Sequence, residues 1–179
     1  MRDESVTDIR HSPDHARHSE GAFAGLADDR LLFAYTRYGA GRGMDADSAE
    51  LVGRFSADGG RTWSAPPRLL VANEGACNVM SVSLLRMRDG RLALFYLRKN
   101  GWLDCAPFVR YSRDEGESWG DPVRIVPFLG YFVLNNDRVI QLSSGRIIMA
   151  LCQHHHAARP DGVPGVFKEV GFTKVRIVA

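Results

Sequence analysis

Short runs in which apolar and polar residues alternate recur along this 179-residue chain. Residues 51–55 (LVGRF) and 108–111 (FVRY) follow such a pattern, which is typical of a β-strand with one buried face. The Asp-Gly pair at 89–90 and the Ser-Gly pair at 144–145 are turn signals that join two strands into a hairpin. No segment keeps a 3.6-residue apolar period with a cap at each end, as an amphipathic helix would. The pattern therefore predicts an all-β fold.

Two elements of the sequence repeat, which indicates that the strands form similar units. The motif S-x-D-x-G-x-[ST]-W occurs at residues 56–63 and again, 56 residues later, at 112–119. A second element, in which an arginine precedes an apolar strand-like run, occurs at 29–35, 89–96 and 144–151. A period of this length suits four short antiparallel strands and their turns. The repeats therefore predict consecutive four-stranded antiparallel sheets, as in the blades of a β-propeller.

The repeated loop carries residue types that stabilise a turn. Its aspartate can accept hydrogen bonds from backbone N–H groups, its glycine can adopt a positive φ, and its tryptophan can fill space between neighbouring sheets. The residues are Ser56, Asp58, Gly60 and Trp63 in the first loop and Ser112, Asp114, Gly116 and Trp119 in the second. We expect them to support the fold rather than to take part in a reaction.

Composition and charge narrow the class of protein. Hydrophobic residues make up 45% of the chain and charged residues 25%, which is typical of a soluble globular protein. A formal net charge of +2 is far from the strongly basic balance of most nucleic-acid-binding domains. No apolar run is long enough to span a membrane, and the charged start of the chain does not resemble a signal peptide. We therefore expect a cytoplasmic protein with no nucleic-acid or membrane partner.

The cysteines and histidines predict neither a disulfide framework nor a metal centre. The three cysteines, Cys77, Cys105 and Cys152, lack CxxC spacing and fit small buried positions. Three consecutive histidines at 154–156 chelate a metal poorly, because adjacent residues of an extended segment point to opposite faces. The histidines at 11, 15 and 18 would need a helix to converge. We expect no metal and no cofactor.

The two repeated loops resemble the Asp-boxes, or bacterial neuraminidase repeats, of the sialidase superfamily. Four further stretches resemble a bacterial sialidase-like branch of it, namely 18–23 (HSEGAF), 78–81 (NVMS), 95–100 (FYLRKN) and 134–138 (LNNDR). The resemblance covers residues 18 to about 152. It implies a six-bladed β-propeller and an exo-α-sialidase activity on a glycan that ends in a sugar acid.

The resemblance also implies how the chain is divided. Residues 1–17 are expected to be an N-terminal extension, and residues 18–179 a partial propeller domain of about three four-stranded blades. The chain is thus expected to hold the N-terminal half of the propeller. Open sheet edges favour pairing with another chain, so self-association through exposed blade edges is a further expectation.

A general acid is the catalytic group that this half of the family's sequence would supply. In the family, an aspartate acid/base lies between the first arginine-led strand and the first Asp-box, which here is the interval 36–51. The resemblance implies Asp47 for this role, with Asp45 as the second choice. A solvated acidic loop or a turn cap explains the same residues equally well.

Arginines are expected to bind the substrate carboxylate, because guanidinium groups form paired hydrogen bonds with it. The family's first such arginine lies in an F/Y-R-I-P stretch, but this chain has Glu-Gly-Ala-Phe at 20–23 instead. Arg37, Arg98 and Arg138 are therefore the candidates, at positions where propeller strands point toward the central axis. Surface arginines paired with Asp or Glu fit the same sequence.

The remaining candidates are polar residues and one methionine near the resembling stretches. Two consecutive asparagines and an aspartate lie between apolar residues, where they are costly unless hydrogen-bonded. They can bind sugar hydroxyls or tie a β-turn together. The candidates for substrate binding are Asn78, Met80, Asn136 and Asp137.

These observations predict a sialidase-like exo-glycoside hydrolase from which the nucleophile is missing. The family's Tyr nucleophile and its Glu come from later blades, and the five tyrosines here lie in the earlier part of the fold. We expect the chain alone to hydrolyse α-sialosides at a trace rate at most. The alternative is a non-catalytic Asp-box module that binds carbohydrate or protein.

Overall fold

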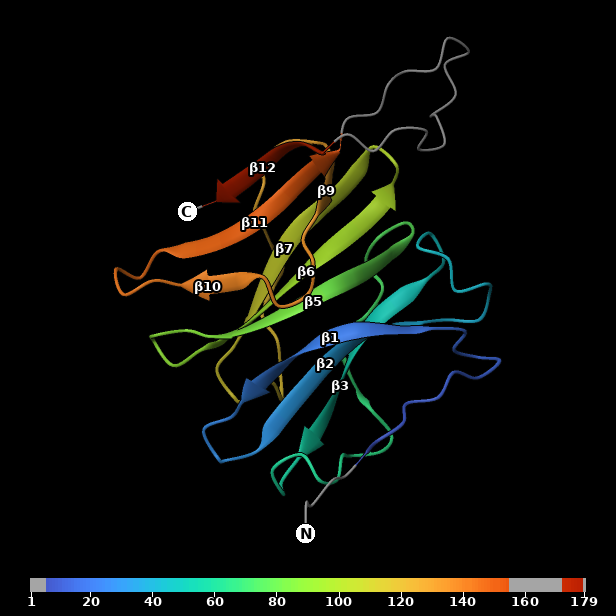
Figure 1. Ribbon diagram of the computed structural model, residues 1–179, viewed down its shortest axis with the longest axis vertical. Coiled ribbons are helices and arrows are strands. Elements are labelled where there is room, and N and C mark those ends of the chain that lie inside the picture. The colour runs from blue at the N-terminus through green and yellow to red at the C-terminus, as the bar shows by residue number, and fades with distance from the viewer. Residues whose placement is uncertain (1–5, 155–171, 179) are drawn as a thin grey trace.

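The computed structural model describes residues 6–154 and 172–178, and every regular element among them is a β-strand (Figure 1). This confirms the all-β fold that the alternating pattern predicts. The described residues contain no helix long and apolar enough to cross a membrane.

The first four strands form one antiparallel sheet, here called unit 1. They are β1 (His18–Gly25), β2 (Leu31–Tyr38), β3 (Ala49–Ser56) and β4 (Arg68–Val71), and they lie in this order. β1 begins at His18.

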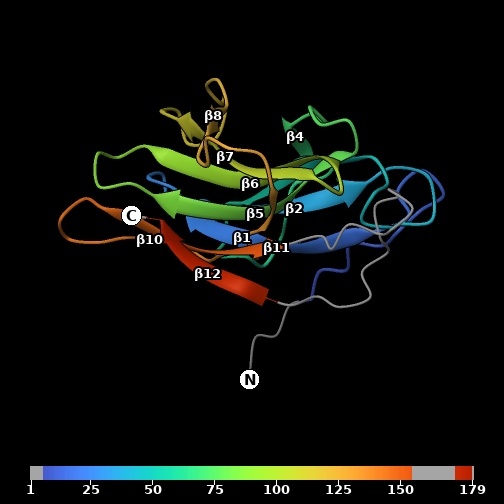
Figure 2. The same ribbon diagram turned by 90° about the horizontal axis from the view of Figure 1, so that it is seen from above.

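The next four strands repeat this arrangement and are called unit 2. They are β5 (Asn78–Arg86), β6 (Leu92–Gly101), β7 (Asp104–Ser112) and β8 (Val123–Arg124), again antiparallel and in sequence order. The two repeated loops therefore lie in equivalent places, each between the third and fourth strand of its unit. The fourth strands β4 and β8 lie on the same side of the molecule (Figure 2).

The last strands form unit 3, which differs from the expected third four-stranded sheet. They are β9 (Tyr131–Val133), β10 (Val139–Gln141), β11 (Ile147–His154) and β12 (Phe172–Val178). β9 and β10 both pair with β11 and are two halves of one interrupted strand, so the described part is three strands wide. β9 also pairs in parallel with β7, which joins units 2 and 3 into one sheet and corrects the expectation of separate sheets.

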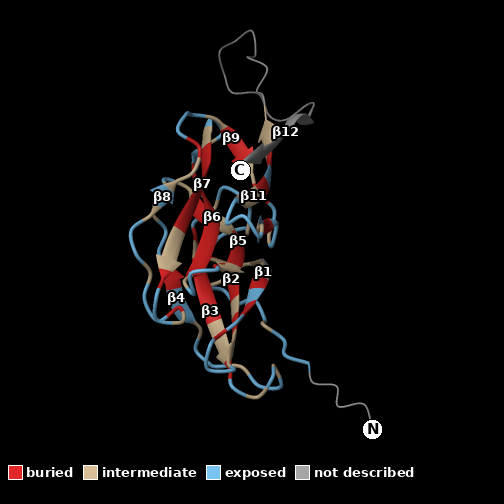
Figure 3. Ribbon diagram, turned by 90° about the vertical axis from the view of Figure 1, so that its left-hand side faces the viewer, coloured by how far each residue is buried: buried red, intermediate tan, exposed pale blue. Residues whose placement is uncertain are grey.

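Two apolar cores hold the units together. Leu32 of unit 1 and Leu94 of unit 2 belong to the first core, and both are fully buried. Phe95 of unit 2 and Leu151 of unit 3 belong to the second. Because successive side chains of a strand point to opposite faces, β6 contributes alternately to the two cores. Buried residues accordingly follow the strands, and exposed ones the turns (Figure 3).

Candidate functional site

A cleft of about 730 Å³ lies where the three units meet at one end of their strands. Each unit contributes side chains to it. Those used below are Arg17, Tyr38, Asp45, Met80, Trp102, Tyr131 and Asn136. The cleft therefore collects three of the residues that the sequence singles out, Asp45, Met80 and Asn136.

Irregular first strands shape the cleft. The register of β1 shifts between His18 and Gly21, and that of β5 shifts between Met80 and Ser83. In unit 3 the gap between β9 and β10 falls at the corresponding place. Such bulges turn side chains out of the regular alternation, and they are frequent next to binding sites. All three units thus break their first strand beside the cleft.

Arg17 and Asp45 form an ion pair at the cleft. The Arg17 Nη2 atom donates to Asp45 Oδ1 over 2.9 Å and to the Tyr38 hydroxyl over 2.8 Å. Its Nη1 atom donates to the Gly43 carbonyl over 2.9 Å. The side chains are 36% and 61% exposed, so both can be reached from solvent. The pair therefore offers a cation and a carboxylate to whatever enters the cleft.

Asp47, the first choice for the acid/base, is absent from the cleft lining and caps its own loop. Its Oδ2 atom accepts hydrogen bonds from the backbone N–H groups of Arg42 and Met44, over 3.1 and 2.9 Å. Gly41 and Gly43 permit this turn because both have a positive φ, of 149° and 68°. The structure thus gives Asp47 the turn-cap arrangement and places Asp45 in the cleft.

Two buried donors fix the position of the Asp45 loop. Asn78 is fully buried, and its Nδ2 atom donates to the carbonyls of Asp45 and Asp47, each over 2.9 Å. Lys99 is 1% exposed, and its ammonium group donates to the Asp45 carbonyl over 3.0 Å. Asn78, a predicted substrate-binding residue, therefore acts from beneath the loop. Lys99 places a second positive charge there.

Aromatic rings form another part of the cleft lining. Trp102 and Tyr131 stack with ring centroids 6.2 Å apart at 16°, and the Lys99 ammonium lies 4.5 Å from the Trp102 ring centroid. Burial raises the pKa of Tyr131, so its phenol stays neutral. The wall can pack against the apolar face of a sugar ring, and it offers no phenolate nucleophile.

The three arginines predicted from the sequence lie outside the cleft lining. Arg37 pairs with Glu50, its partner across β2 and β3. The Arg98 guanidinium lies 4.0 Å from the centroid of the Phe108 ring. Arg138 donates to the backbone carbonyls of Asn136 and Asp137. These groups have structural partners, as the alternative of paired surface arginines predicts for Arg37.

The other predicted binding residues divide between the cleft and its surroundings. Met80 lines the cleft and accepts a hydrogen bond from the Tyr38 hydroxyl at its sulfur atom, over 3.5 Å. Asn136 also lines it, and its buried Oδ1 atom has no hydrogen-bond partner among the described residues. Asp137 has a φ of 54° and is exposed in the turn that follows. Met80 and Asn136 thus line the cleft, and Asp137 does not.

One buried Tyr–carboxylate pair lies elsewhere. The Tyr96 hydroxyl donates to Glu74 Oε1, and Arg110 donates to Glu74 Oε2 over 2.9 Å. Burial, together with Glu74, raises the pKa of Tyr96 well above its ordinary value. The group ties the segment after unit 1 to unit 2, and it is not an activated nucleophile.

The two repeated loops lie at the far end of β3 and β7 and bond internally in the same way. The Asp58 carboxylate accepts from Ser56 Oγ over 2.8 Å, and from the backbone N–H and hydroxyl of Thr62 over 2.8 and 2.6 Å. Asp114 makes the equivalent bonds with Ser112 and Ser118.

These bonds are charge-assisted, and they lower the pKa of both aspartates to about 2. Gly60 and Gly116 have φ values of 90° and 82°, as a turn of this kind requires. The hydrogen bonds of the two aspartates are internal to their loops, and the loop residues are absent from the cleft lining.

No group of three or more His, Cys, Asp or Glu side chains that could hold a metal ion occurs in the described part of the chain. Of the consecutive histidines, His155 and His156 lie outside the described residues.

Sequence reasoning missed Arg17, Lys99 and Trp102. Lys99 lies within the resembling stretch 95–100, and Arg17 comes directly before the resembling stretch 18–23. These positions were the signal by which both residues could have been chosen as candidates. Their roles depend on contacts across units that no local pattern shows.

The fold is similar to that of solved sialidases. A leech intramolecular trans-sialidase, complexed with 2,7-anhydro-Neu5Ac, is 12% identical with a TM-score of 0.65, and the match covers 86% of this chain and 43% of that one. A Hadza microbial sialidase is 15% identical with a TM-score of 0.62, over 84% of this chain and 37% of that one. A family 117 glycoside hydrolase from Zobellia galactanivorans is 15% identical with a TM-score of 0.58, over 88% and 54%.

These similarities show an all-β fold of the sialidase propeller type. The chain spans about half of each of these structures or less. No protein-family model matches the sequence, and no curated protein matches it.

Proposed function

We propose that the cleft binds the acidic group of a terminal sugar, and that Asp45 is the proton donor of a sialidase-like glycoside hydrolase. The observation that carries the proposal is the Arg17–Asp45 pair at the cleft. With Lys99 beneath the loop, this region holds two positive charges and one negative charge. Such a balance favours an anionic ligand. Sialidases and a glycoside hydrolase with a similar fold support a glycan as that ligand.

A bound sugar carboxylate would compete with Asp45 for the Arg17 guanidinium. Arg17 offers planar N–H groups that match a carboxylate, and its partner Asp45 is 61% exposed and free to turn away. Once released, the Asp45 carboxyl group can face the glycosidic oxygen. Protonation of that oxygen by a carboxylic acid assists departure of the leaving group. Substrate binding would thus prepare the acid.

The rest of the site supports this role. Asn78 and Lys99 hold the Asp45 carbonyl, and Asp47 closes the loop through the N–H groups of Arg42 and Met44. The side chain of Asp45 therefore moves on a fixed backbone. Trp102 and Tyr131 provide a flat apolar wall for the sugar ring.

The complete reaction needs a nucleophile from outside the described residues. Tyr96 and Tyr131 have raised pKa values, and Tyr96 is tied to Glu74 and Arg110. We therefore propose that the chain alone hydrolyses sialosides at a trace rate at most. Without a nucleophile, the acid can assist departure of the leaving group, but no side chain attacks the sugar carbon that the leaving group departs from.

We also propose that the two repeated loops are Asp-boxes whose role is structural. The carboxylates of Asp58 and Asp114 accept hydrogen bonds from residues of their own loops. The loops lie at the opposite end of β3 and β7 from the cleft.

A binding experiment tests the recognition of the acidic group. Ligand-observed NMR compares N-acetylneuraminic acid with its uncharged methyl ester. The acid is expected to bind about tenfold more tightly than the ester, since a charge-assisted hydrogen bond is lost with the charge. Arg17→Met is expected to abolish this difference. Arg37→Met is the matched control, because Arg37 is paired with Glu50 outside the cleft lining. Equal binding of acid and ester, or full binding by Arg17→Met, would overturn the proposal.

Hydrolysis of an aryl sialoside tests the acid. A longer polypeptide that adds downstream blades is expected to be active, and in it Asp45→Asn should slow substrates with poor leaving groups most. Asp47→Asn is expected to loosen the loop and to weaken binding for all leaving groups alike. Fast turnover by the 179-residue chain itself would contradict the proposal that the nucleophile lies outside the described residues.

A non-catalytic carbohydrate-binding module is the second candidate. It is favoured by one observation, namely that burial raises the pKa of Tyr131, so this phenol of the cleft is not activated as a nucleophile. Sugar-acid binding that is retained in an inactive longer polypeptide would support this second function.

A further inference from the structure

The part of the cleft beside Asp45 is apolar and open to solvent. Met44 comes directly before Asp45, lines the cleft and is 60% exposed. Trp102 also lines the cleft and is 44% exposed, whereas Tyr131, on which it stacks, is 6% exposed. The apolar lining of the cleft therefore reaches solvent at Met44 and Trp102. We call these two side chains the apolar mouth.

Lys99 places the Trp102 ring close to the loop that carries Asp45. Its buried ammonium group donates to the Asp45 carbonyl over 3.0 Å and lies 4.5 Å from the centroid of the Trp102 ring. Met44 belongs to the turn between β2 and β3, and Trp102 to the turn between β6 and β7. Units 1 and 2 thus each supply one apolar side chain near Asp45.

The apolar mouth combines an adaptable side chain with a rigid one. The backbone of Met44 is fixed, because its N–H donates to Asp47 Oδ2 and its carbonyl accepts from the Asp47 N–H, each over 2.9 Å. Its thioether side chain has three rotatable bonds and adapts to groups of different shape. The Trp102 indole is a flat apolar surface that is held against Tyr131 and Lys99. Such a pair suits an apolar ligand group of variable shape.

Polar groups of the cleft come from other elements. Ser19 lies on β1, Ser81 lies at the bulge of β5, and Asn136 lies between β9 and β10, and all three line the cleft. They therefore belong to the first strands of units 1, 2 and 3. Hydroxyl and amide groups of this kind can bind the hydroxyl groups of a terminal sugar. The cleft thus has polar groups along the first strands and apolar groups at the turns.

The proposed reaction determines where the leaving group begins. Asp45 protonates the glycosidic oxygen, so the leaving group that is bonded to this oxygen starts beside the Asp45 carboxyl group. Met44 precedes Asp45 in the chain, and Trp102 shares Lys99 with the Asp45 carbonyl. A leaving group that extends from this point toward solvent therefore contacts the apolar mouth.

We propose that the apolar mouth binds the leaving group, and that the site prefers sugar-acid glycosides of an apolar alkyl or aryl group over those of a second sugar. The inference rests on the proposed function, because the place of the leaving group follows from the role of Asp45. An apolar group is stabilised at the mouth because its surface is removed from water. A second sugar brings hydroxyl groups, which gain little from an apolar surface.

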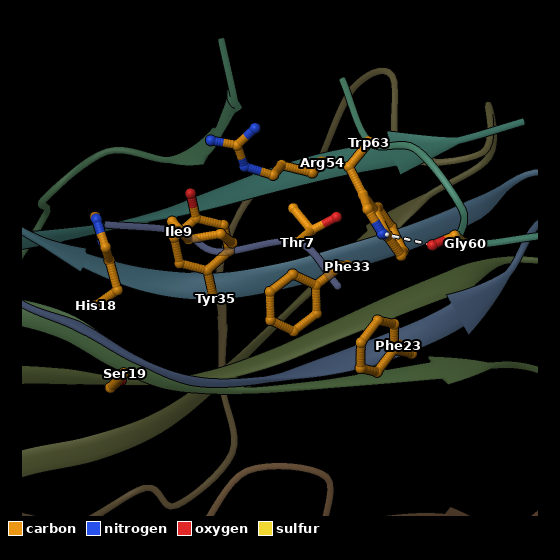
Figure 4. A pocket seen from close by; sticks show the side chains of 10 residues that line it. All are labelled: Thr7, Ile9, His18, Ser19, Phe23, Phe33, Tyr35, Arg54, Gly60 and Trp63. Atoms are coloured by element: carbon orange, nitrogen blue, oxygen red, sulfur yellow. Dashed lines mark hydrogen bonds between the residues drawn. The ribbon is translucent and has the colours of Figure 1, made fainter. Parts of the chain in front are cut away.

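A second aromatic surface, on unit 1, is the competing place for an apolar group. Phe23 stacks on Phe33 with ring centroids 4.5 Å apart, and together with Trp63 they line a pocket of about 380 Å³ (Figure 4). We call the surface of these three rings the aromatic face. Counted from the arginine of the repeat, Phe33 corresponds to Leu94, which is fully buried in the core between units 1 and 2. The aromatic face thus corresponds to a surface on which another unit packs, and Asp45 does not line its pocket.

Titration of the 179-residue chain with intact glycosides, followed by ligand-observed NMR, tests the inference. The chain is expected to hydrolyse them at a trace rate at most, so they persist during the measurement. The benzyl and hexyl α-glycosides of N-acetylneuraminic acid are each expected to bind about tenfold more tightly than the methyl α-glycoside, because apolar surface is buried. Sialyllactose, whose leaving group is a sugar, is expected to bind within about twofold of the methyl glycoside, since its hydroxyl groups gain little there.

Substitutions locate the apolar group. Met44→Ser is expected to lower the ratio of the benzyl affinity to the methyl affinity from about ten to about three or less, because the thioether contact is lost. Leu103→Ser is the matched control, since Leu103 is also 60% exposed but is absent from the cleft lining, and it is expected to keep the ratio. Phe23→Ser, on the aromatic face, is expected to keep it as well.

A methyl signal reports the contact without any change at the mouth. In the wild-type chain labelled with carbon-13 at the methionine methyl groups, the Met44 signal is identified by its absence from Met44→Leu. The benzyl glycoside is expected to shift this signal through the ring current, and the methyl glycoside is expected to leave it in place. This measurement does not depend on whether Met44→Ser folds.

The outcomes separate this inference from the proposed function. Equal binding of the methyl, benzyl and hexyl glycosides, or sialyllactose that binds as tightly as the benzyl glycoside, would overturn the inference and leave the proposed function standing. If neither N-acetylneuraminic acid nor its methyl glycoside bound, the proposed function would be wrong, and this inference with it. A gain that survives Met44→Ser and is lost in Phe23→Ser would place the apolar group on the aromatic face and would also overturn the inference.

Discussion

Units 1 and 2 repeat the same loop, but the tryptophan of each loop has different surroundings. The internal bonds of Asp58 and Asp114 are equivalent atom for atom. Trp119 nevertheless packs against the core between the two units, whereas Trp63 lies on the aromatic face beside Phe23 and Phe33.

The comparison separates two kinds of information in the sequence. Hydrogen bonds within a loop depend on residues a few positions apart, so the motif determines them in both units. Burial depends on the neighbouring units. Among the described residues, a neighbouring unit packs on each face of unit 2 but on only one face of unit 1. Substitutions at equivalent positions therefore test which energies are local and which come from the neighbour.

The largest difference is expected for the paired substitutions Leu94→Ala and Phe33→Ala. Leu94 is fully buried between two sheets, and its loss is expected to lower the free energy of unfolding by about 2–5 kcal/mol. Phe33→Ala at the equivalent position is expected to cost less than half as much in the dilute chain, because its face is open. Urea unfolding at low protein concentration measures both. Equal losses would show that the aromatic face is covered within a single chain.

The serines that begin the two loops are expected to behave alike. Ser56 and Ser112 are 1% and 2% exposed, and each accepts the N–H of a loop glycine over 2.8 Å. Replacement by alanine leaves that donor unpaired, which costs about 1–3 kcal/mol. Thermal unfolding of Ser56→Ala and Ser112→Ala is expected to show losses of the same size. A loss of stability in only one of the two variants would contradict the view that residues within the loop determine these hydrogen bonds.

The smallest effect is a shared dependence on pH. Both aspartates have pKa values of about 2 in the folded chain, against an ordinary 3.8. A lowered pKa favours folding while the carboxylates are charged, so stability is present above about pH 4 and is lost as the pH falls toward 2. The melting temperature of the Asp58→Asn, Asp114→Asn double variant is expected to change less over this range than that of the wild type. If the melting temperatures of the double variant and the wild type fell in parallel with pH, this expectation would be wrong.

The fold was largely predictable from the sequence, because its signals are local. Alternation and turn pairs identify strands, and the repeated motif places both loops between third and fourth strands. The join of units 2 and 3 was not predictable, since it depends on one parallel pairing, between Cys105 and Tyr131.

The site was predicted less well, for a physical reason. Asp45 and Asp47 are two residues apart, and which carboxylate faces the cleft depends on the turn through Gly41 and Gly43. Arg37 lies opposite Glu50 across two adjacent strands, so correct strand register would have revealed its ion pair. Arg17 reaches Asp45 across 28 residues of sequence, which no local pattern shows.

A crystal of the chain soaked with N-acetylneuraminic acid tests the central claim most directly, because it shows where a sugar acid binds. The account predicts the sugar carboxylate within hydrogen-bonding distance of the Arg17 guanidinium, with Asp45 turned away from it and the ring against Trp102. Sugar bound at the aromatic face beside Trp63, or at Arg37, would contradict the assignment of the cleft.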